Sequence, residues 1–307
     1  MMLSKIDKKK WYSFKLFLYV LPFLVLVLLF SYYPLYGWLY AFYDYRPPRP
    51  FSEAEFVGLK WFKSLVENPV KISQLLQVLK NTFVMSGITL GTSWLPMLFA
   101  VFLNEIKCMP FRKFVQTVTT LPNFISWVLV YSLAFSLFNS TGMVNTLLLN
   151  MGVIKEPVLL LQSSEHVWLT QWLWLTWKNL GWAAIMYIAA ISSIDDELFQ
   201  AAKVDGATRM QMIRYITIPC LLPTFFVLLM MNIGNFLSNG MEQYYVFQNA
   251  FNKEYIQVLD LYVYNLAMGS GSYSVSVALS MLKSVVSVIL LIVANAISKM
   301  TRGESFL

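Results

Sequence analysis

The stretch that decides the fold is SIDDELFQAAKVDGATRMQMIRYITIP, residues 193–219, which lies between two long apolar segments. Its first half predicts a short helix with Ser193 as the N-cap, because the carboxylates that follow suit the positive end of a helix dipole. Gly206 can adopt the left-handed conformation that ends a helix. We therefore expect the first helix to stop at Gly206.

The second half predicts another short helix. Thr208 is its expected N-cap, and Gln211 completes a capping box three residues later. Asp205 lies on the apolar face of the first helix and needs a partner, which Arg209 or the free N–H groups of the second helix could supply. The residues leave two interpretations open: a compact helix–glycine–helix turn that contacts another protein, or amphipathic helices that lie on lipid.

The composition indicates an integral membrane protein. Of 307 residues, 58% are hydrophobic and only 13% are charged, whereas soluble chains average about 45–50% and about 25%. A single soluble domain could not hide so much apolar surface, and a disordered chain needs the opposite balance. The net charge of +7 comes from basic residues between apolar runs. Such residues set membrane orientation, so we expect lipid and no nucleic acid as a partner.

A membrane span needs about 20 mostly apolar residues, and six segments qualify. They predict an all-α polytopic membrane protein with six transmembrane helices, at residues 16–43, 82–103, 114–138, 167–194, 219–241 and 275–297. Basic residues concentrate in both tails and in the second–third and fourth–fifth connections. By the positive-inside rule, both termini and residues 193–218 face the cytoplasm. The other three connections, around 44–76, 139–166 and 243–274, are then external.

No residue pattern predicts chemistry within the chain itself. Cys108 and Cys220 lack metal-type spacing, and His166 has no obvious set of cysteines or carboxylates around it. We expect no catalytic residue, no metal site and no enzyme activity. The chain also lacks the glycine-rich phosphate loop of nucleotide-binding proteins, so another subunit must bind ATP if transport uses it.

Polar residues in the fifth segment predict a path for substrate. Asn232, Asn235, Asn239 and Glu242 have the spacing of one helical face. Polar side chains are costly in lipid and normally face the interior of a helix bundle. Hydrogen bonds between helices are the alternative role.

Aromatic and amide side chains of the third and fourth segments could also contact a sugar. These are Trp177, Asn179, Trp182, Trp127 and Tyr131, for which simple packing is the alternative. Lys178 is a mid-span cation that could pair with Glu242 or face an acidic sugar. Trp168 and Trp172 stand near a predicted helix end, where an interfacial aromatic belt is expected.

The run Gln200-Ala201-Ala202-x-x-Asp205-Gly206-Ala207, followed by Ile216-x-Ile218-Pro219, resembles the EAA loop of ABC importer permeases. Two positions depart from the family pattern: Gln200 stands for the usual Glu, and Ile218 stands for Leu. Other motifs resemble the LplB-like subgroup that serves complex carbohydrates, including Tyr33-Pro34-x-Tyr36-Gly37, Leu121-Pro122-x-Phe124-Ile125-Ser126-Trp127 and Gly240-Met241-Glu242-Gln243.

The resemblance implies a type I ABC importer permease in a bacterial plasma membrane. Its core would span residues 77–298, after a tail, first helix and external loop at 1–76 and before a cytoplasmic tail at 299–307. It implies a second, different permease, two ABC ATPases that bind ATP and Mg²⁺, an extracytoplasmic solute-binding protein, and oligosaccharide as substrate. The ATPase contact would involve Gln200, Ala201, Ala202, Asp205, Gly206, Ala207 and Arg209.

An ion-coupled secondary transporter is the alternative class. Such proteins usually contain broken mid-membrane helices and internal repeats. Neither is evident in the sequence.

Overall fold

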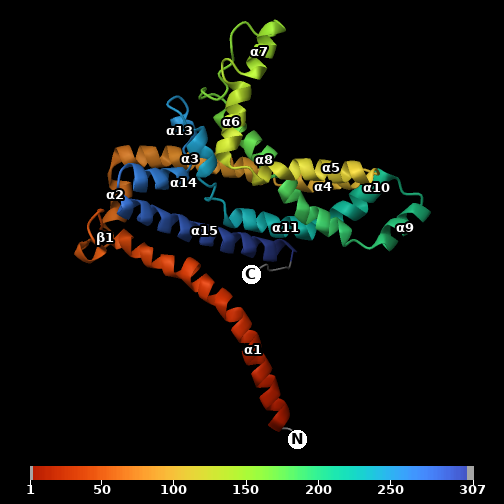
Figure 1. Cartoon of the computed structure of the whole chain (residues 1–307), viewed down its shortest axis with the longest axis horizontal. Coiled ribbons are helices and arrows are strands. Elements are labelled where there is room, and N and C mark those ends of the chain that lie inside the picture. The colour runs from red at the N-terminus through yellow and green to blue at the C-terminus, as the bar shows by residue number, and fades with distance from the viewer. Residues whose placement is uncertain (1–2, 303–307) are drawn as a thin grey trace. The chain divides into compact units, whose positions relative to one another are not determined.

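Helices form almost all of the described structure. The computed structural model describes residues 3–302, and in this range the only strands are β1 (Tyr43–Asp44) and β2 (Glu55–Phe56), which pair antiparallel (Figure 1). The all-α prediction is confirmed. The chain divides into two compact units. One takes the residues up to Asn68 with Leu266–Leu282, and the other takes Pro69–Asn265 with the residues from Lys283 onward.

The first unit contains the first apolar segment and the loop after it. Its helix α1 (Leu3–Val27) continues through a π-helical turn (Leu28–Tyr32) into a 3-10 helix (Tyr33–Phe42). Pro34 accounts for the change, because proline lacks the N–H group that an α-helix needs and its ring clashes with the preceding turn. The short 3-10 helix Phe51–Glu53 and α2 (Lys60–Glu67) follow.

Tyr43 ties this loop together. Its carbonyl oxygen accepts hydrogen bonds from Trp61 Nε1 at 3.0 Å and from Ser274 Oγ at 2.7 Å. The Ser274 hydroxyl also accepts the N–H of Tyr45 at 3.2 Å. Because Ser274 lies in the first turn of α15 (Tyr273–Arg302), the loop is fixed to the start of that helix.

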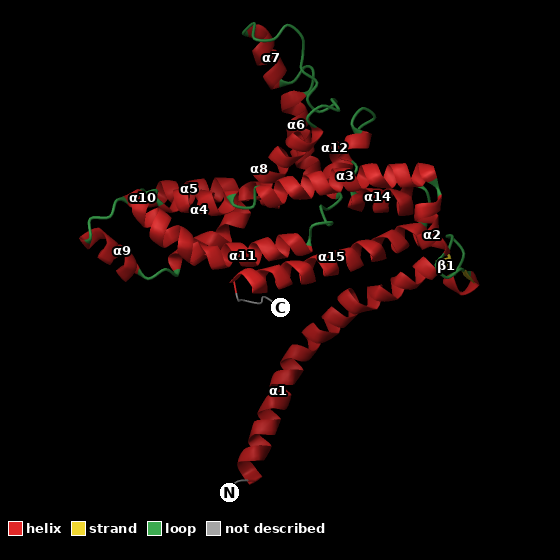
Figure 2. Cartoon of the chain, turned by 180° about the vertical axis from the view of Figure 1, so that it is seen from behind, coloured by secondary structure: helices red, strands yellow, loops and turns green. Residues whose placement is uncertain are grey.

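The second unit holds the remaining helices. In chain order they are α3 (Pro69–Gly91), α4 (Leu95–Asn104), α5 (Met109–Thr120), a 3-10 turn (Leu121–Phe124), α6 (Trp127–Phe138), α7 (Met143–Asn150), α8 (Val167–Ser192), α9 (Asp196–Val204), α10 (Arg209–Met212), a π-helical turn (Ile213–Thr217), α11 (Ile218–Gly234), α12 (Glu242–Phe247), α13 (Lys253–Ile256), α14 (Leu259–Tyr264), a π-helical turn (Asn265–Gly269) and the later part of α15. Helices α9 and α10 lie at one end of this unit, and α13 and α14 lie toward the other (Figures 1 and 2).

Two helices of this unit are interrupted. The turn at residues 92–94 separates α3 from α4, and Pro122 separates α5 from α6. After the second break, α6 and α7 run in a very different direction from α5 (Figures 1 and 2). Broken helices are therefore present, contrary to the interpretation of the sequence. Proline lacks a hydrogen-bond donor and restricts the residue before it, which explains the break at 121–126.

Close packing of α4, α8 and α11 forms one part of the core. Met97, Ala100, Ala184, Tyr187 and Leu221 are buried there. At Gly181 the backbone of α8 approaches α5 so closely that an added Cβ atom would lie 2.3 Å from the carbonyl oxygen of Thr119. Only glycine permits this approach.

Five helical stretches in the described range are long and apolar enough to cross a membrane: Lys10–Phe42, Pro69–Asn104, Trp127–Asn150, Arg209–Gly234 and Tyr273–Met300. They overlap the predicted first, second, third, fifth and sixth segments, in that order. The predicted second and third segments, 82–103 and 114–138, are wrong as single helices because the turn at 92–94 and the break at Pro122 divide them.

The predicted fourth segment forms α8. Its 26 residues exceed what a bilayer core of about 30 Å requires, but polar residues such as Gln171, Lys178 and Asn179 interrupt its apolar character, and it is not among the five. Of the predicted tails, residues 1–2 and 303–307 lie outside the described range.

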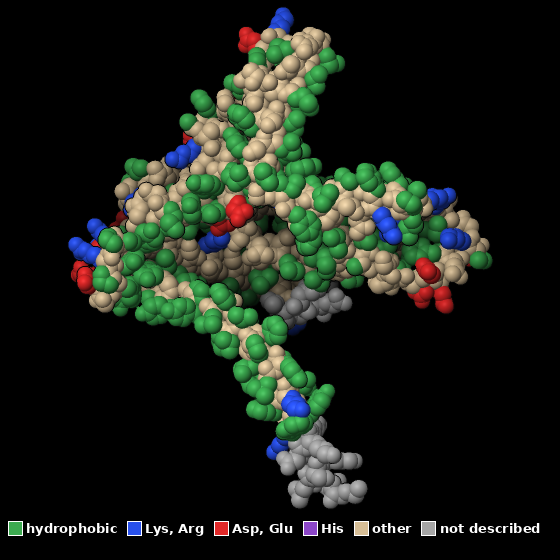
Figure 3. Space-filling model, in the orientation of Figure 1, with side chains coloured by type: hydrophobic (Ala, Val, Ile, Leu, Met, Phe, Trp, Pro, Cys, Tyr) green, Lys and Arg blue, Asp and Glu red, His purple; other side chains and the backbone are tan. Residues whose placement is uncertain are grey.

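Hydrophobic side chains cover much of the surface of the helices (Figure 3). Such a surface suits lipid, where apolar groups need no burial within the protein. Charged side chains gather at the end of the second unit that carries α9 and α10.

Candidate functional site

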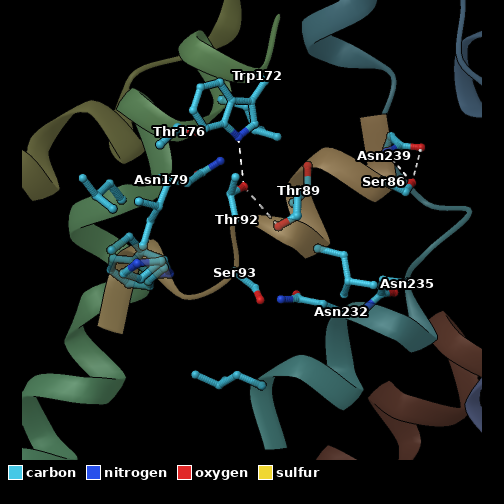
Figure 4. A pocket seen from close by; sticks show the side chains of 18 of the residues that line it. Ser86, Thr89, Thr92, Ser93, Trp172, Thr176, Asn179, Asn232, Asn235 and Asn239 are labelled. Atoms are coloured by element: carbon cyan, nitrogen blue, oxygen red, sulfur yellow. Dashed lines mark hydrogen bonds between the residues drawn. The ribbon is translucent and has the colours of Figure 1, made fainter. Parts of the chain in front are cut away.

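A cavity of about 500 Å³ lies within the second unit, where the interrupted helices meet α8. Its walls come from α3, the turn at 92–94, the start of α4, the middle of α8, and the end of α11 with the turn after it (Figure 4). The polar lining consists of Ser86, Thr89, Thr92, Ser93, Thr176, Tyr187, Ser238, Asn179, Asn232, Asn235 and Asn239, and two indoles, Trp172 and Trp182, join them.

The predicted helical face of the fifth segment is wrong, although three of its four residues meet in this cavity. Helix α11 ends at Gly234, Asn235 is its C-cap, and Asn239 lies in the following turn. Glu242 begins α12 and is not part of the lining. Asn235 and Asn239 therefore reach the cavity because α11 ends before them. The helical spacing of the asparagines does not bring them together.

The wall formed by residues 235–239 is bonded to α3. Asn239 Nδ2 donates to Ser86 Oγ at 2.9 Å, and the Ser86 hydroxyl donates to the carbonyl oxygen of Phe236. Asn235 Nδ2 donates to the carbonyl oxygen of Met231 at 3.0 Å. Asn232 and Ser93 point toward one another across the cavity (Figure 4). Amide and hydroxyl groups thus face the open space from two sides.

The break between α3 and α4 supplies hydroxyl groups to the opposite wall. Thr92 Oγ1 donates to the carbonyl oxygen of Ile88 at 2.7 Å. It accepts the indole N–H of Trp172 at 3.0 Å (Figure 4). Trp172 therefore holds α8 against the break and lines the cavity, rather than belonging to the predicted aromatic belt. Irregular backbone at membrane depth is tolerated where it lines a cavity.

Asn179 and Trp182 also reach the cavity from α8. Asn179 Oδ1 accepts a hydrogen bond from Asn123 Nδ2 at 2.9 Å. Trp182 is 49% exposed, and its ring meets the ring of Phe124 edge to face, with centroids 5.6 Å apart. The exposed part of this indole offers an aromatic face to a ligand.

The other predicted aromatic residues lie outside this cavity. Trp127 and Tyr131 pack against Phe247 of α12, with ring centroids 6.4 Å and 5.1 Å apart. Trp177 meets Trp174 with centroids 5.8 Å apart. For these three residues, packing is the role that the contacts describe.

Lys178 is bound by backbone carbonyl groups. Its Nζ donates to the carbonyl oxygens of Pro122, Asn123 and Ile125, and it lies 5.5 Å from the centre of the Trp127 ring. The break between α5 and α6 leaves carbonyl groups without helical partners. Lys178 satisfies them, so its three donors are used within the protein.

The α9–α10 turn is fixed by hydrogen bonds of its own. Gly206 has φ of +76°, its N–H donates to Lys203 O at 3.1 Å, and the N–H of Ala207 donates to Ala202 O at 2.9 Å. This pair of bonds is the Schellman motif that closes a helix. The predicted capping box of α10 is confirmed, with Thr208 N–H donating to Gln211 Oε1 at 2.7 Å.

Two local predictions for this turn are wrong. The N-cap of α9 is Asp195, whose carboxylate accepts the N–H of Glu197 at 3.0 Å, while the Ser193 hydroxyl donates to Ala190 O at the end of α8. The carboxylate of Asp205 has no hydrogen bond or ion pair within residues 3–302, so Arg209 is not its partner. Asp205 itself serves as the C-cap of α9.

The surface of the α9–α10 turn is open. Gln200, Ala201, Asp205, Gly206 and Arg209 are exposed, and Ala202 and Ala207 are half-buried. Val204 and Met210 are 88% and 68% exposed, although both are apolar. Apolar side chains beside small residues form a surface that suits contact with another protein.

Within the described residues, no group of three or more His, Cys, Asp or Glu side chains could hold a metal ion. Cys108 and Cys220 are both exposed and are not bonded to one another. The two features that combine several predicted residues are therefore the cavity and the α9–α10 turn.

Comparisons with known proteins agree on one family. Residues 94–303 match the family described as binding-protein-dependent transport system inner membrane component. The chain is 37% identical over 300 residues to the polygalacturonan/rhamnogalacturonan transport system permease protein YteP of Bacillus subtilis (strain 168), covering 97% of this chain and 90% of the relative. It is 34% identical over 301 residues to protein LplB of the same organism, covering 97% and 91%.

A solved structure supports the same assignment. The chain superposes with a TM-score of 0.82 and 32% identity on a chain of a bacterial ABC transporter involved in the import of the acidic polysaccharide alginate, covering 98% and 100% of the two chains. These matches confirm the resemblance and leave the ion-coupled alternative without support. They describe a multi-pass inner-membrane transport subunit rather than an enzyme. The chain therefore belongs to the binding-protein-dependent transport system inner membrane component family, the permease subunits of ABC importers.

Proposed function

We propose that this permease carries oligosaccharides or polysaccharide fragments through the cavity of the second unit, driven by an ABC ATPase that docks on the α9–α10 turn. The observation that supports this most is the composition of the cavity. Breaks in the helices bring Asn232, Asn235 and Asn239 together with hydroxyl groups and the indoles of Trp172 and Trp182.

The chemistry of such a lining matches a polyol. Each carboxamide offers both donors and acceptors, and each hydroxyl can do either. Aromatic rings cover the less polar faces of sugar rings, and ligand cavities generally combine apolar walls with a few placed polar groups. A carbohydrate can therefore replace its water hydrogen bonds while it passes between apolar helices.

The relatives favour a carbohydrate over other polar solutes. YteP is named for polygalacturonan and rhamnogalacturonan transport, and the superposed transporter imports alginate. All three are polysaccharides. We infer that the substrate of this chain is a related glycan fragment.

The proposed complex contains further subunits. A second permease, different from this one, would complete the path, and two ABC ATPases would bind ATP and Mg²⁺. A solute-binding protein would deliver the sugar at the external loops. A solved structure of a bacterial alginate ABC transporter supports this arrangement, because it contains an alginate pentasaccharide-bound periplasmic protein. The chain superposes on one chain of that complex with a TM-score of 0.84 and 32% identity.

In the proposed mechanism, the α9–α10 turn receives movement from the ATPases. The turn faces the cytoplasm, and ATP-driven closure of the ATPases displaces it together with α8 and α11, which flank it in the chain. Displacement of these helices would open the cavity alternately to the two sides of the membrane. In this mechanism the chain itself contributes the cavity and the α9–α10 turn, and ATP hydrolysis occurs on its partner subunits.

The test uses the complete transporter in proteoliposomes that contain ATP, with its solute-binding protein outside. Uptake is measured for labelled fragments of polygalacturonan, rhamnogalacturonan and alginate and for one neutral glucan fragment. The wild-type complex should take up at least one of them, and Asn232→Leu should reduce that uptake at least tenfold while ATP hydrolysis continues.

The matched control is Asn104→Leu, a half-buried asparagine at the end of α4 that does not line the cavity and lies outside the external loops. It should leave uptake unchanged. Failure of every fragment to enter, or equal uptake by both asparagine variants, would remove this cavity from the transport path.

A further inference from the structure

The turn at residues 235–241 is held from behind by a carboxylate. Asp260, in α14, accepts the N–H of Gly240 on Oδ2 at 2.8 Å. Gly240 directly follows Asn239, whose amide lines the cavity and binds Ser86. Gly240 has φ of +75°, in the left-handed region that favours glycine. The position of this wall therefore depends on one side-chain acceptor.

The same carboxylate is paired with α15. Its Oδ1 accepts a hydrogen bond from Lys283 Nζ, and the two side chains are only 17% and 19% exposed. Lys283 lies about 15 Å along α15 from its first residue, Tyr273, at 1.5 Å per residue. This depth is about half of the about 30 Å hydrocarbon layer, where charged groups are costly and are retained for function.

Helix α15 also contacts the other end of the turn. The Leu291 side chain packs against Gly234, where an added Cβ atom would lie 3.3 Å from Leu291 Cδ1. Lys283 and Leu291 are separated by two helical turns and so share one face of α15. That face therefore holds both ends of the segment that carries Asn235 and Asn239.

Stability alone is a weak reason for such an ion pair. Replacing a buried ion pair with apolar residues is often neutral or stabilising. An apolar replacement here, however, would remove the acceptor of the Gly240 N–H and free this exposed residue to move. What the carboxylate adds is the fixed position of the turn.

We propose that Asp260 is a positioning residue for the cavity: by holding Gly240 and pairing with Lys283, it places Asn239 and sets the affinity for oligosaccharide. This inference rests on the proposed function of the cavity. It adds that α15 controls the affinity for oligosaccharide. A shift of α15 would move Lys283 and Leu291 together, and with them both ends of the segment that carries Asn235 and Asn239. Neither Lys283 nor Asp260 lines the cavity, so both act through the turn.

Two double variants separate the acceptor from the charge. Asp260→Asn/Lys283→Met and Asp260→Leu/Lys283→Met are both neutral and similar in size. Only the first keeps an oxygen that can accept the Gly240 N–H. Binding of the fluorescently labelled fragment with the best wild-type uptake is measured on the complex in nanodiscs, without solute-binding protein, so that affinity reports the permeases alone. Basal ATP hydrolysis is measured on the same samples.

We expect the asparagine double variant to bind within about twofold of wild type. The leucine double variant should bind about tenfold more weakly, the upper end of what one hydrogen bond contributes. Basal ATP hydrolysis should be equal in both. A merely structural role would lower the yield and activity of both variants together. Equal affinities for the two variants would overturn the proposal.

Two single variants complete the test. Ser287→Ala changes the same face of α15 between Lys283 and Leu291 and should leave affinity unchanged. Asn239→Leu removes the positioned side chain itself and should weaken binding at least as much as the leucine double variant. If Asn239→Leu weakens binding but the double variants match, the cavity stands and the role of Asp260 fails. If Asn239→Leu has no effect, the cavity assignment and the inference fail together.

Discussion

The ammonium group of Lys178 lies 2.6 Å from the carbonyl oxygen of Ile125, at the point where the chain turns from α5 toward α6. Two more carbonyl groups, of Pro122 and Asn123, complete its shell. The cation thus takes the place of the N–H groups that a continuous helix would have supplied. A lysine in the middle of α8 therefore stabilises the break that Pro122 introduces between α5 and α6.

Lys178→Met should destabilise the transporter. It removes three charged hydrogen bonds and leaves the carbonyl groups of Asn123 and Ile125 unpaired, while Pro122 O keeps the N–H of Ile125 at 3.2 Å. Each hydrogen bond to a charged group contributes about 1.5–3 kcal/mol. We expect a lower melting temperature of the purified complex, measured by fluorescence-detected size exclusion. Lys155→Met, at an exposed lysine, is the control. Equal melting temperatures for the two variants would show that these bonds do not support the bend.

Gly181→Ala should separate α5 from α8. The added methyl group would lie 2.3 Å from the carbonyl oxygen of Thr119, a backbone atom that cannot move alone. Overpacking of this kind typically costs about 1–3 kcal/mol. Gly87→Ala is the matched control, since that helical glycine has nothing within 4 Å of an added Cβ atom. Chemical denaturation of both variants should show a loss at Gly181 and none at Gly87.

Gly206→Leu should uncouple ATP hydrolysis from uptake. A leucine at φ of +76° is strained, and its side chain would project from the surface proposed to enter the ATPase. Gly152→Leu imposes a similar strain at φ of +68° in another turn, with the same free space around its Cβ position. The number of sugars imported per ATP hydrolysed should fall at least tenfold for Gly206→Leu only. Near-normal coupling in that variant would refute docking on this turn.

Trp182→Leu should weaken oligosaccharide binding, whereas Trp177→Leu should not. The two indoles are similarly exposed, at 49% and 41%, and both belong to α8. Only Trp182 lines the cavity. Loss of an aromatic face should raise the dissociation constant several-fold, read by titration of the labelled fragment. A larger effect at Trp177 would place the sugar path on the opposite side of α8.

Local rules explain which parts of the structure could be predicted. The capping box of Thr208 and Gln211 and the left-handed Gly206 involve residues three or fewer positions apart, so the sequence contains all the information they need. The Ser193 prediction failed because Asp195 competes for the same role two residues later, and a carboxylate is an equally good cap.

The end of α11 had a signal that the periodicity of the asparagines obscured. Gly234-Asn235 and Asn239-Gly240 are typical turn pairs, and glycine lowers helix stability. The break at Pro122 had a similar signal in Leu121-Pro122. The sequence therefore contained a signal for the end of α11 and for the break at Pro122. The long apolar runs around both positions favoured the prediction of continuous helices.

The roles of Trp172 and Lys178 were beyond reach of the sequence. Their partners are Thr92 in the turn after α3 and the backbone of residues 122–125, which are distant in the chain. A tryptophan near a helix end suggests the membrane interface until a neighbouring helix is known to be interrupted beside it. The partner of a lysine cannot be inferred when that partner is a carbonyl group that every residue has.

The α9–α10 turn is folded by its own hydrogen bonds, before the proposed ATPase binds. Its Schellman bonds and capping box join residues of the turn to one another, so no neighbour is needed to give it shape. Binding therefore carries little ordering entropy, and release restores the same conformation. A turn of this kind could bind and release the proposed ATPase once per catalytic cycle without refolding. It could also transmit movement of the ATPase in either direction.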